Sequence, residues 1–318
     1  MRVLMIFLDG WGIGENNPAK NPYFHAHTPA LDGLLGGHIL FSGVGMLERP
    51  DMVLIPTDTT LGVPGIPQSA TGQTTLWTGI NAARAVGRHV HAFPNEELRG
   101  IIARHSIMKV LCQRGKKVTF ANAYRPEYFD GVRRGKYRHS TSTLTALSGG
   151  VRLRTIEDLK KGKAVYQEFT NKLLQEMGFS IEEVSPRTAG MRLARLSVEH
   201  DFTLYEYFIT DRVGHARDMG KAVKVLQALD EFIGEVLLTI DPVNTMVIIT
   251  SDHGNIEDVS VKTHTSNPVP TIIVTRDVAR FYPLNIRSLE DISGLLLRVL
   301  DAEGEAVPEL LPLEQQKL

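Results

Sequence analysis

The chain is short of cysteine, of net charge and of long hydrophobic runs. Cys112 is the only cysteine, which rules out an internal disulfide and zinc sites built from several thiolates. The formal net charge is −1, from 35 basic and 36 acidic residues, so no overall positive field recruits nucleic acid or an anionic membrane. These absences predict a cytoplasmic protein that binds neither nucleic acid nor membranes.

The apolar segments are too short for a membrane or a signal sequence. Residues 2 to 8 form an apolar run that Asp9 ends well below the length of a signal-peptide core or a membrane span, so no targeting segment is predicted. The chain also has no internal repeat, low-complexity tract or heptad array. With 318 residues, 42% of them hydrophobic, it can bury a large core, and its oligomeric state is left open.

Apolar strand patterns alternate with helical patterns along most of the chain. Strands are predicted at residues 2 to 8, 117 to 123, 202 to 210, 245 to 250 and 269 to 274, and helices at 28 to 35, 94 to 114, 188 to 200, 217 to 240 and 288 to 300. This order is typical of an α/β fold with a mostly parallel sheet. The pattern loosens after residue 125, which predicts a core formed by residues 1–124 and 186–318 and a small insert or cap at 125–185.

Acidic residues follow three of the predicted strands directly. Asp9, Asp211 and Asp252 take these positions. Carboxyl ends of neighbouring parallel strands lie about 4.8 Å apart, so the three carboxylates can converge there, at a cost that cations would offset. The sequence therefore predicts a metal site at this edge of the sheet.

Histidines accompany these acids. His215 follows Asp211 across a Val-Gly pair that we interpret as a turn, His253 is adjacent to Asp252, and His264 lies before the last strand. Carboxylates and imidazoles together suit Zn, Mn or Fe and do not exclude Mg, and the set has enough ligands for two divalent ions. Taken singly, the pair Asp211 and His215 and the pair Asp252 and His253 are each more typical of an ordinary turn. A single histidine such as His264 is more typical of the surface.

Ser69 is the best candidate for a nucleophile. It lies where a loop rich in proline and glycine meets a predicted helix, whose amides and dipole would stabilise a phosphoryl group. The same position suits an ordinary helix-capping serine. Hydroxyls at Thr71, Thr74 and Thr75 are nearby alternatives.

Basic residues offer candidate contacts for an anionic substrate. Arg84 follows the Ser69 helix, Arg125 follows the strand at 117 to 123, and Arg138 belongs to a basic cluster in the insert. A solvated surface charge run is the alternative interpretation of this cluster.

Five segments resemble motifs of the alkaline phosphatase superfamily and occur in the same order. Within that superfamily, they are most similar to the branch of cofactor-independent phosphoglycerate mutases and phosphopentomutases. The segments are Leu8-Asp-Gly-Trp-Gly12, Gly62-Val-Pro-Gly-Ile-Pro-Gln-Ser-Ala-Thr-Gly72, Asp211-Arg-Val-Gly-His215, Ser251-Asp-His-Gly-Asn255 and Thr263-His-Thr-Ser-Asn-Pro-Val-Pro270. The resemblance covers residues 1 to about 124 and 186 to 275.

The resemblance implies a three-layer alkaline-phosphatase-like core and two divalent ions, Mn or Zn. It assigns one ion to Asp211, His215 and His264, and the other to Asp9, Ser69, Asp252 and His253, with Ser69 as the residue that becomes a phosphoserine. Two features depart from the branch. Gln73 stands where the branch has a histidine, and the chain is much shorter than the mutases.

The expected reaction is phosphoryl transfer from a small phosphorylated metabolite. Water as the acceptor would make the chain a phosphatase or phosphodiesterase, and a second hydroxyl would make it a phosphomutase. The small insert favours hydrolysis, because a mutase must exclude water from the phosphoserine. A sulfatase would need a Pro and an Arg after the nucleophile that are missing here. The alternative outside the enzymes is a non-catalytic metal-binding module on the same fold.

Overall fold

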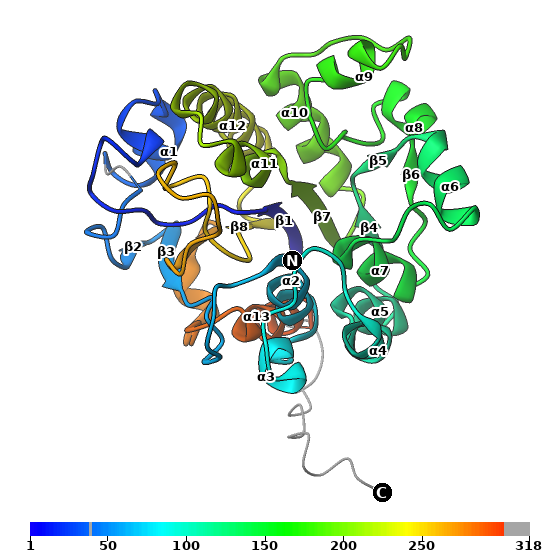
Figure 1. Ribbon diagram of the computed structural model, residues 1–318, viewed down its shortest axis with the longest axis horizontal. Coiled ribbons are helices and arrows are strands. Elements are labelled where there is room, and N and C mark those ends of the chain that lie inside the picture. Colours follow the sequence, from blue (N-terminus) through cyan, green and yellow to red (C-terminus); the bar gives the residue numbers. More distant parts are fainter. Residues whose placement is uncertain (38–39, 302–318) are drawn as a thin grey trace, which may run out of the picture.

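A seven-stranded sheet forms the centre of the molecule. The computed structural model describes residues 1–37 and 40–301, so the last residues assigned above to the core, 302–318, lie outside the described part. The strand order is β2-β3-β9-β8-β1-β7-β4 (Figure 1). The strands are β1 (Arg2–Leu8), β2 (Leu47–Arg49), β3 (Met52–Thr57), β4 (Val118–Phe120), β7 (Phe202–Tyr207), β8 (Thr245–Thr250) and β9 (Val269–Val274).

Five of the seven strands run in one direction. Strands β4, β7, β1 and β8 pair in parallel. Strand β9 is antiparallel to both β8 and β3, so β3 runs with the parallel group, and β2 is antiparallel to β3. The predicted α/β class with a mostly parallel sheet is confirmed, and the sheet as a whole is mixed.

Strand β1 lies in the middle because its side chains are apolar on both faces. Val3, Met5 and Phe7 enter one buried cluster, and the alternating Leu4, Ile6 and Leu8 enter another. Successive side chains of a strand point to opposite faces, so an unbroken apolar run needs cover on both sides.

Helices provide that cover and complete three layers. On the face of Phe7 lie α2 (Ser69–Thr78), α5 (Ile107–Gln113), α7 (Thr141–Ser148) and α13 (Glu290–Asp301), with α4 (Glu96–His105) packed on α2. On the face of Leu8 lie α1 (Pro29–Leu34), α10 (Pro186–Ser197) and α12 (Met219–Thr239). This three-layer arrangement confirms the predicted architecture.

Three predicted elements differ from the structure. The helix expected at 94 to 114 is interrupted at Ser106, whose side chain caps α5. The strand expected at 117 to 123 stops at Phe120, and β5 (Ala123–Tyr124) joins a second sheet with β6 (Arg154–Thr155). The strand expected at 202 to 210 ends at Tyr207, and α11 (Ile209–Ala216) follows, so Asp211 and His215 lie on a helix and not across a turn.

Residues 125–185 contain short elements around a small core of their own. These are α6 (Pro126–Arg133), α7, β6, α8 (Ile156–Lys160) and α9 (Lys172–Glu176). Ile156, Leu159 and Leu174 form a separate apolar cluster with Ala123, whereas Ala146 of α7 packs in the core beneath the main sheet. The division into a core and an insert at 125–185 stays a proposal.

The remaining short elements contribute buried residues to the layers, among them Tyr23, Ala83 and Val278. They are α3 (Ala82–Val86) and two 3-10 turns, Pro22–Phe24 and Val278–Phe281. Within residues 1–37 and 40–301, no helix has the length and apolar character that crossing a bilayer requires.

Candidate metal centre and active site

Three acidic residues meet at the carboxyl ends of adjacent strands. Asp9 follows β1, Asp252 follows β8, and Asp211 lies in the first turn of the helix after β7. Strand β1 lies between the other two, so the acids converge as the sequence predicted. The Thr210 hydroxyl donates to the Asp9 carbonyl at 2.5 Å and holds the start of α11 against the end of β1.

Glycines permit this close approach. Gly10 has a φ of +69°, which side-chain-bearing residues rarely adopt, and a Cβ there would lie 2.9 Å from the Asp211 Cβ. A Cβ at Gly72 in α2 would lie 2.9 Å from the Asp252 carbonyl oxygen. Both glycines belong to motifs of the sequence analysis, and here each one brings two segments of the site together.

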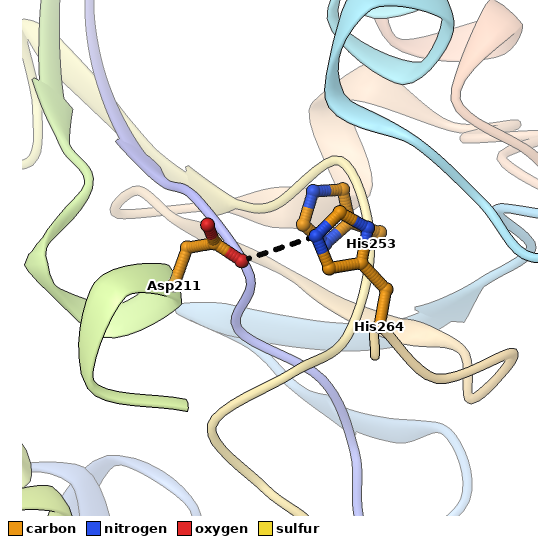
Figure 2. Close-up of side chains that lie close together, drawn as sticks. All are labelled: Asp211, His253 and His264. Carbon is orange, nitrogen blue, oxygen red and sulfur yellow. Dashed lines mark ion pairs between the residues drawn. The ribbon is translucent and has the colours of Figure 1, made fainter. Parts of the chain in front are cut away.

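Asp211, His215 and His264 form one group of potential ligands. The His215 Nε2 lies 3.4 Å from Asp211 Oδ2 and 3.2 Å from His264 Nε2, and His264 Nε2 lies 3.4 Å from Asp211 Oδ1. Figure 2 shows Asp211 facing His264. Ligands about 2.0–2.1 Å from a tetrahedral ion are separated by about 3.3–3.4 Å, so this spacing fits a shared cation.

Hydrogen bonds orient both of these imidazoles. The Nδ1–H of His264 donates to the Pro67 carbonyl at 2.9 Å, and that of His215 donates to the Lys262 carbonyl at 3.0 Å. Each Nε2 is therefore the ring nitrogen that faces the group. Metal-binding histidines are commonly held in this way.

A second group surrounds His253. Its Nε2 lies 3.3 Å from Asp9 Oδ1, 3.6 Å from Asp252 Oδ2 and 2.9 Å from the Ser69 Oγ. The His253 ring stacks on that of His264 at 3.7 Å between centroids. Ligand atoms of His253 lie within 4.8 Å of those of Asp211 and His264 as well as those of Asp9 and Asp252, so the two groups are continuous.

The buried acids need a compensating charge. Burial raises the pKa of Asp9 well above its ordinary value, and the Asp252 and Asp211 carboxylates add to the shift. Asp9 Oδ1 is buried and accepts no hydrogen bond. Clustered carboxylates and imidazoles with an unused oxygen are the donor set that a divalent cation takes, so the residues fit such an ion.

The histidine protonation states follow from the same acids. Burial lowers the pKa of His253. For His264, burial opposes the charged ring, but the hydrogen bond and the charge of Asp211 outweigh it and raise the pKa. Burial likewise opposes the Asp211 carboxylate, and its imidazole and amide partners lower its pKa on balance.

Ser69 faces the cluster, whereas the neighbouring hydroxyls do not. Ser69 is the first residue of α2, and Gln68 occupies the capping position, so the serine is not the helix cap. Thr71, Thr74 and Thr75 each donate to a carbonyl of the same helix or its cap, at 3.1, 2.6 and 2.8 Å. Only Ser69 of these four hydroxyls bonds to a predicted metal ligand.

Gln73 bridges the two acids of the second group. Its side-chain amide donates to Asp9 Oδ2 at 3.3 Å and to Asp252 Oδ2 at 3.0 Å. In the sequence, Gln73 stands out as a departure from the motif and carries no evident role. The structure places it one helical turn from Ser69, in the position from which it orients both carboxylates.

Asn255 and Glu257 connect the ligand loops and were missed by the sequence analysis. The Asn255 amide donates to Asp211 Oδ1 at 2.6 Å. The buried Glu257 carboxylate accepts from the backbone N–H of Gly12 at 3.0 Å and of Asn255 at 2.7 Å, and from the Thr265 hydroxyl and the Asn267 amide. Asn255 lies in a quoted motif, whereas nothing in the local sequence marks Glu257.

The three arginines predicted to contact the substrate lie in two different places. Arg125 and Arg138 line a cavity of about 520 Å³. Arg84 is exposed on α3 and is not among the residues that line that cavity.

Comparisons with known proteins agree with this geometry. A family model described as the metalloenzyme superfamily matches residues 181–303, the segment that carries Asp211, His215, Asp252, His253 and His264. Solved structures of similar fold include a phosphoglycerate mutase of Leishmania mexicana, with a TM-score of 0.58 and 12% identity over 97% of this chain and 96% of that one. The structure of an alkaline phosphatase of the Antarctic bacterium TAB5 has a TM-score of 0.56 and 14% identity, over 94% of this chain and 97% of that one.

Residues 181–303 thus resemble the metalloenzyme superfamily, and the chain shares its fold with the phosphoglycerate mutase and the alkaline phosphatase. A third member of this structural group is the PH0037 protein of Pyrococcus horikoshii, with a TM-score of 0.59 and 16% identity over 96% of this chain and 98% of that one. The match to a metalloenzyme superfamily implies a divalent metal, for which the two ligand groups are the candidates.

Curated relatives that match part of the chain are 2,3-bisphosphoglycerate-independent phosphoglycerate mutases. The protein of Staphylococcus saprophyticus is 34% identical over 119 residues, which are 36% of this chain and 20% of the relative. That of Antithamnion sp. is 32% identical over 132 residues, 37% of this chain and 26% of the relative. The match therefore spans about a fifth to a quarter of these relatives.

Proposed function

We propose that the chain is a metal-dependent phosphoryl-transfer enzyme with Ser69 as its nucleophile, a phosphatase or phosphodiesterase acting on a small phosphorylated metabolite. The observation that carries this proposal is the 2.9 Å contact between Ser69 Oγ and His253 Nε2, at the start of α2 and beside the buried acids Asp9 and Asp252. The single cysteine favours a reducing compartment such as the cytoplasm.

The proposed ligands follow the two groups of the structure. Asp211, His215 and His264 would hold one divalent ion, and Asp9, Ser69, Asp252 and His253 the other. Mn or Zn suits this mixture of carboxylates and imidazoles. When bound, two such ions neutralise phosphate oxygens and lower the pKa of a hydroxyl that they coordinate.

The side chains of this chain then act on the phosphoester. The N-terminus of α2 directs its free amides toward the position of the phosphoryl group, where they stabilise negative charge. Ser69 Oγ forms a bond to phosphorus while the ester P–O bond breaks, and the proton that the Ser69 hydroxyl loses is taken up by the leaving alcohol. Water then attacks the phosphoserine, its oxygen bonds to phosphorus, the bond to Oγ breaks, and a proton from that water returns to Ser69 Oγ.

Phosphomutase activity is the second candidate. It is supported by the curated relatives, which are named as mutases, and by a cavity beside the cluster that can retain an acceptor alcohol. In a mutase the acceptor hydroxyl takes the place of water in the second half of the reaction.

Replacement of Ser69 tests the proposal. We expect Ser69→Ala to lower turnover of p-nitrophenyl phosphate or its phenyl phosphodiester, with Mn or Zn added, by at least about 10³-fold, because the covalent step is lost. Thr71→Ala, which removes a hydroxyl bonded to its own helix, is the matched control and keeps turnover.

The same assay separates the alternatives. Normal turnover by Ser69→Ala would contradict the nucleophile assignment. If the wild type turns over neither ester and mass spectrometry detects phosphoserine at Ser69, the result would favour the mutase. Metal binding without turnover or phosphoserine would favour a non-catalytic module.

A further inference from the structure

A cavity of about 520 Å³ lies next to the proposed active site. Glu206 near the end of β7 and Phe208 just beyond it line this cavity. Strand β1 pairs with β7, and the Asp9 backbone N–H donates to the Tyr207 carbonyl at 2.9 Å. The cavity thus begins one strand away from Asp9 and extends over the end of β7 toward α6, on the side of the molecule that Figure 1 draws in green.

Fixed aromatic rings form much of its wall. Tyr124 and Tyr128 lie 4.6 Å apart between ring centroids. The Tyr124 hydroxyl bonds to the Thr143 Oγ1 at 2.6 Å and the Tyr128 hydroxyl to the His139 Nδ1 at 2.7 Å, so both rings are held before a ligand arrives. Four more aromatic residues contribute to the lining: Phe93, Tyr137, Tyr166 and Phe208. Aromatic walls of this kind favour a planar ring.

Three cationic side chains complete the lining. These are Arg125, Lys136 and Arg138. None of them makes an ion pair with another residue in the part of the chain that the structure describes, and the Arg138 guanidinium lies 4.5 Å over the Phe93 ring. Positive charges without acidic partners favour an anionic group on the ligand.

One acid offers a contrasting contact. Glu206, only 8% exposed, is the single acidic residue of the lining. A carboxyl group held there accepts a hydrogen bond from a hydroxyl or a ring N–H of a ligand. The cavity therefore presents aromatic faces, cations and one acceptor, which a three-carbon phosphoester would leave mostly unused, since cavities of this volume hold drug-sized ligands.

We propose that this cavity binds the organic part of the substrate, and that the substrate is a nucleotide with a second anionic group, such as a nucleoside diphosphate. This inference rests on the proposed function for the placement of the reacting phosphoryl group at Ser69. The ring lies against the aromatic wall, and the second anionic group contacts the cations of the lining.

Direct binding to the Ser69→Ala protein, with Mn present, tests the inference without turnover. By calorimetry we expect ADP to bind at least ten-fold more tightly than glycerol 3-phosphate. Arg138→Met and Tyr128→Leu should each weaken ADP binding about ten-fold and leave glycerol 3-phosphate unchanged. Arg133→Met, an exposed position on α6 that pairs with Asp130 outside the cavity, is the matched control.

Equal affinities for ADP and glycerol 3-phosphate would overturn the inference, as would unchanged ADP binding in both cavity variants with native circular dichroism. The two proposals fail separately. Turnover of p-nitrophenyl phosphate through Ser69 without a preference for ADP would leave the proposed function and remove the nucleotide. Selective ADP binding without any turnover or phosphoserine in the wild type would leave the nucleotide site and remove the proposed function.

Discussion

At the scale of single residues, the site depends on side chains that hold the ligands and do not bind metal themselves. Asn255 donates to the Asp211 Oδ1 at 2.6 Å and to the Asp211 carbonyl at 3.1 Å. Its own backbone N–H donates to Glu257. Asn255 thereby links the loop after β8 to helix α11 and directs the Asp211 carboxylate toward His264.

We expect Asn255→Ala to weaken metal binding at the Asp211 group by about 10- to 100-fold, because partners of metal ligands contribute on that scale. Titration of the metal-free protein with Mn, followed by calorimetry, measures the change. Asn244→Ala removes an exposed asparagine that bonds only locally to Asp241, and it should bind Mn like the wild type. Equal affinity in both variants would contradict the positioning role.

At the scale of elements, helix α8 begins with a capping box. The Thr155 Oγ1 accepts from the Asp158 backbone N–H at 3.4 Å, and the Asp158 carboxylate accepts from the Thr155 N–H at 2.8 Å. Arg152 donates two hydrogen bonds to the same carboxylate, at 2.8 and 3.0 Å. The hydrogen bonds from Arg152 hold the pKa of Asp158 well below its ordinary value.

Because this pKa is lower in the folded protein, ionised Asp158 stabilises the fold above its unfolded pKa of about 3.9, and the contribution is lost as the pH falls below that value. We expect Asp158→Asn to lower the free energy of unfolding by about 1 kcal/mol at pH 7. Urea denaturation should show this difference shrinking below about pH 4. Glu157→Gln, on the same helix, changes an exposed pair with Lys160 and should have little effect. A difference independent of pH would contradict the assignment.

At the scale of the whole molecule, the fold concentrates negative charge where three strands end. Asp9 and Asp252 are buried and Asp211 nearly so, and Asp9 lies more than 200 residues before the other two in the sequence. Neutral packing elsewhere must hold these carboxylates together when no cation is bound. A bound divalent ion therefore stabilises the folded chain as well as supplying chemistry.

Metal removal should accordingly destabilise the protein. Ions at about a thousand times their dissociation constant contribute about 4 kcal/mol, so EDTA should lower the melting temperature by on the order of 10 °C, and added Mn or Zn should restore it. Differential scanning calorimetry measures the shift. In Asp9→Asn the shift should be much smaller, whereas Asp241→Asn, which alters an exposed acid outside the cluster, should keep it. A melting temperature indifferent to EDTA in the wild type would contradict a bound stabilising ion.

The local sequence was sufficient where one segment decides its own structure. The apolar runs at β1, β8 and β9 appear where they were predicted, because each strand is buried on both faces and its pattern lies within a few residues. The end of β7 was not predictable in this way. Most residues from Phe202 to Thr210 favour a strand, and the chain turns into α11 where Thr210 bonds to Asp9, 201 residues away.

The candidate site likewise has features that the local sequence determines and features that depend on tertiary contacts. By itself, the sequence determined which residues have ligand chemistry and that Asp9 and Asp252 follow strands, because those features are local. Only the tertiary structure decided that Gln73 bridges Asp9 and Asp252, and that Glu257 joins Gly12 to the last ligand loop across 245 residues. Such contacts depend on which strands become neighbours, and strand order is set by the packing of the whole sheet, which no single segment encodes.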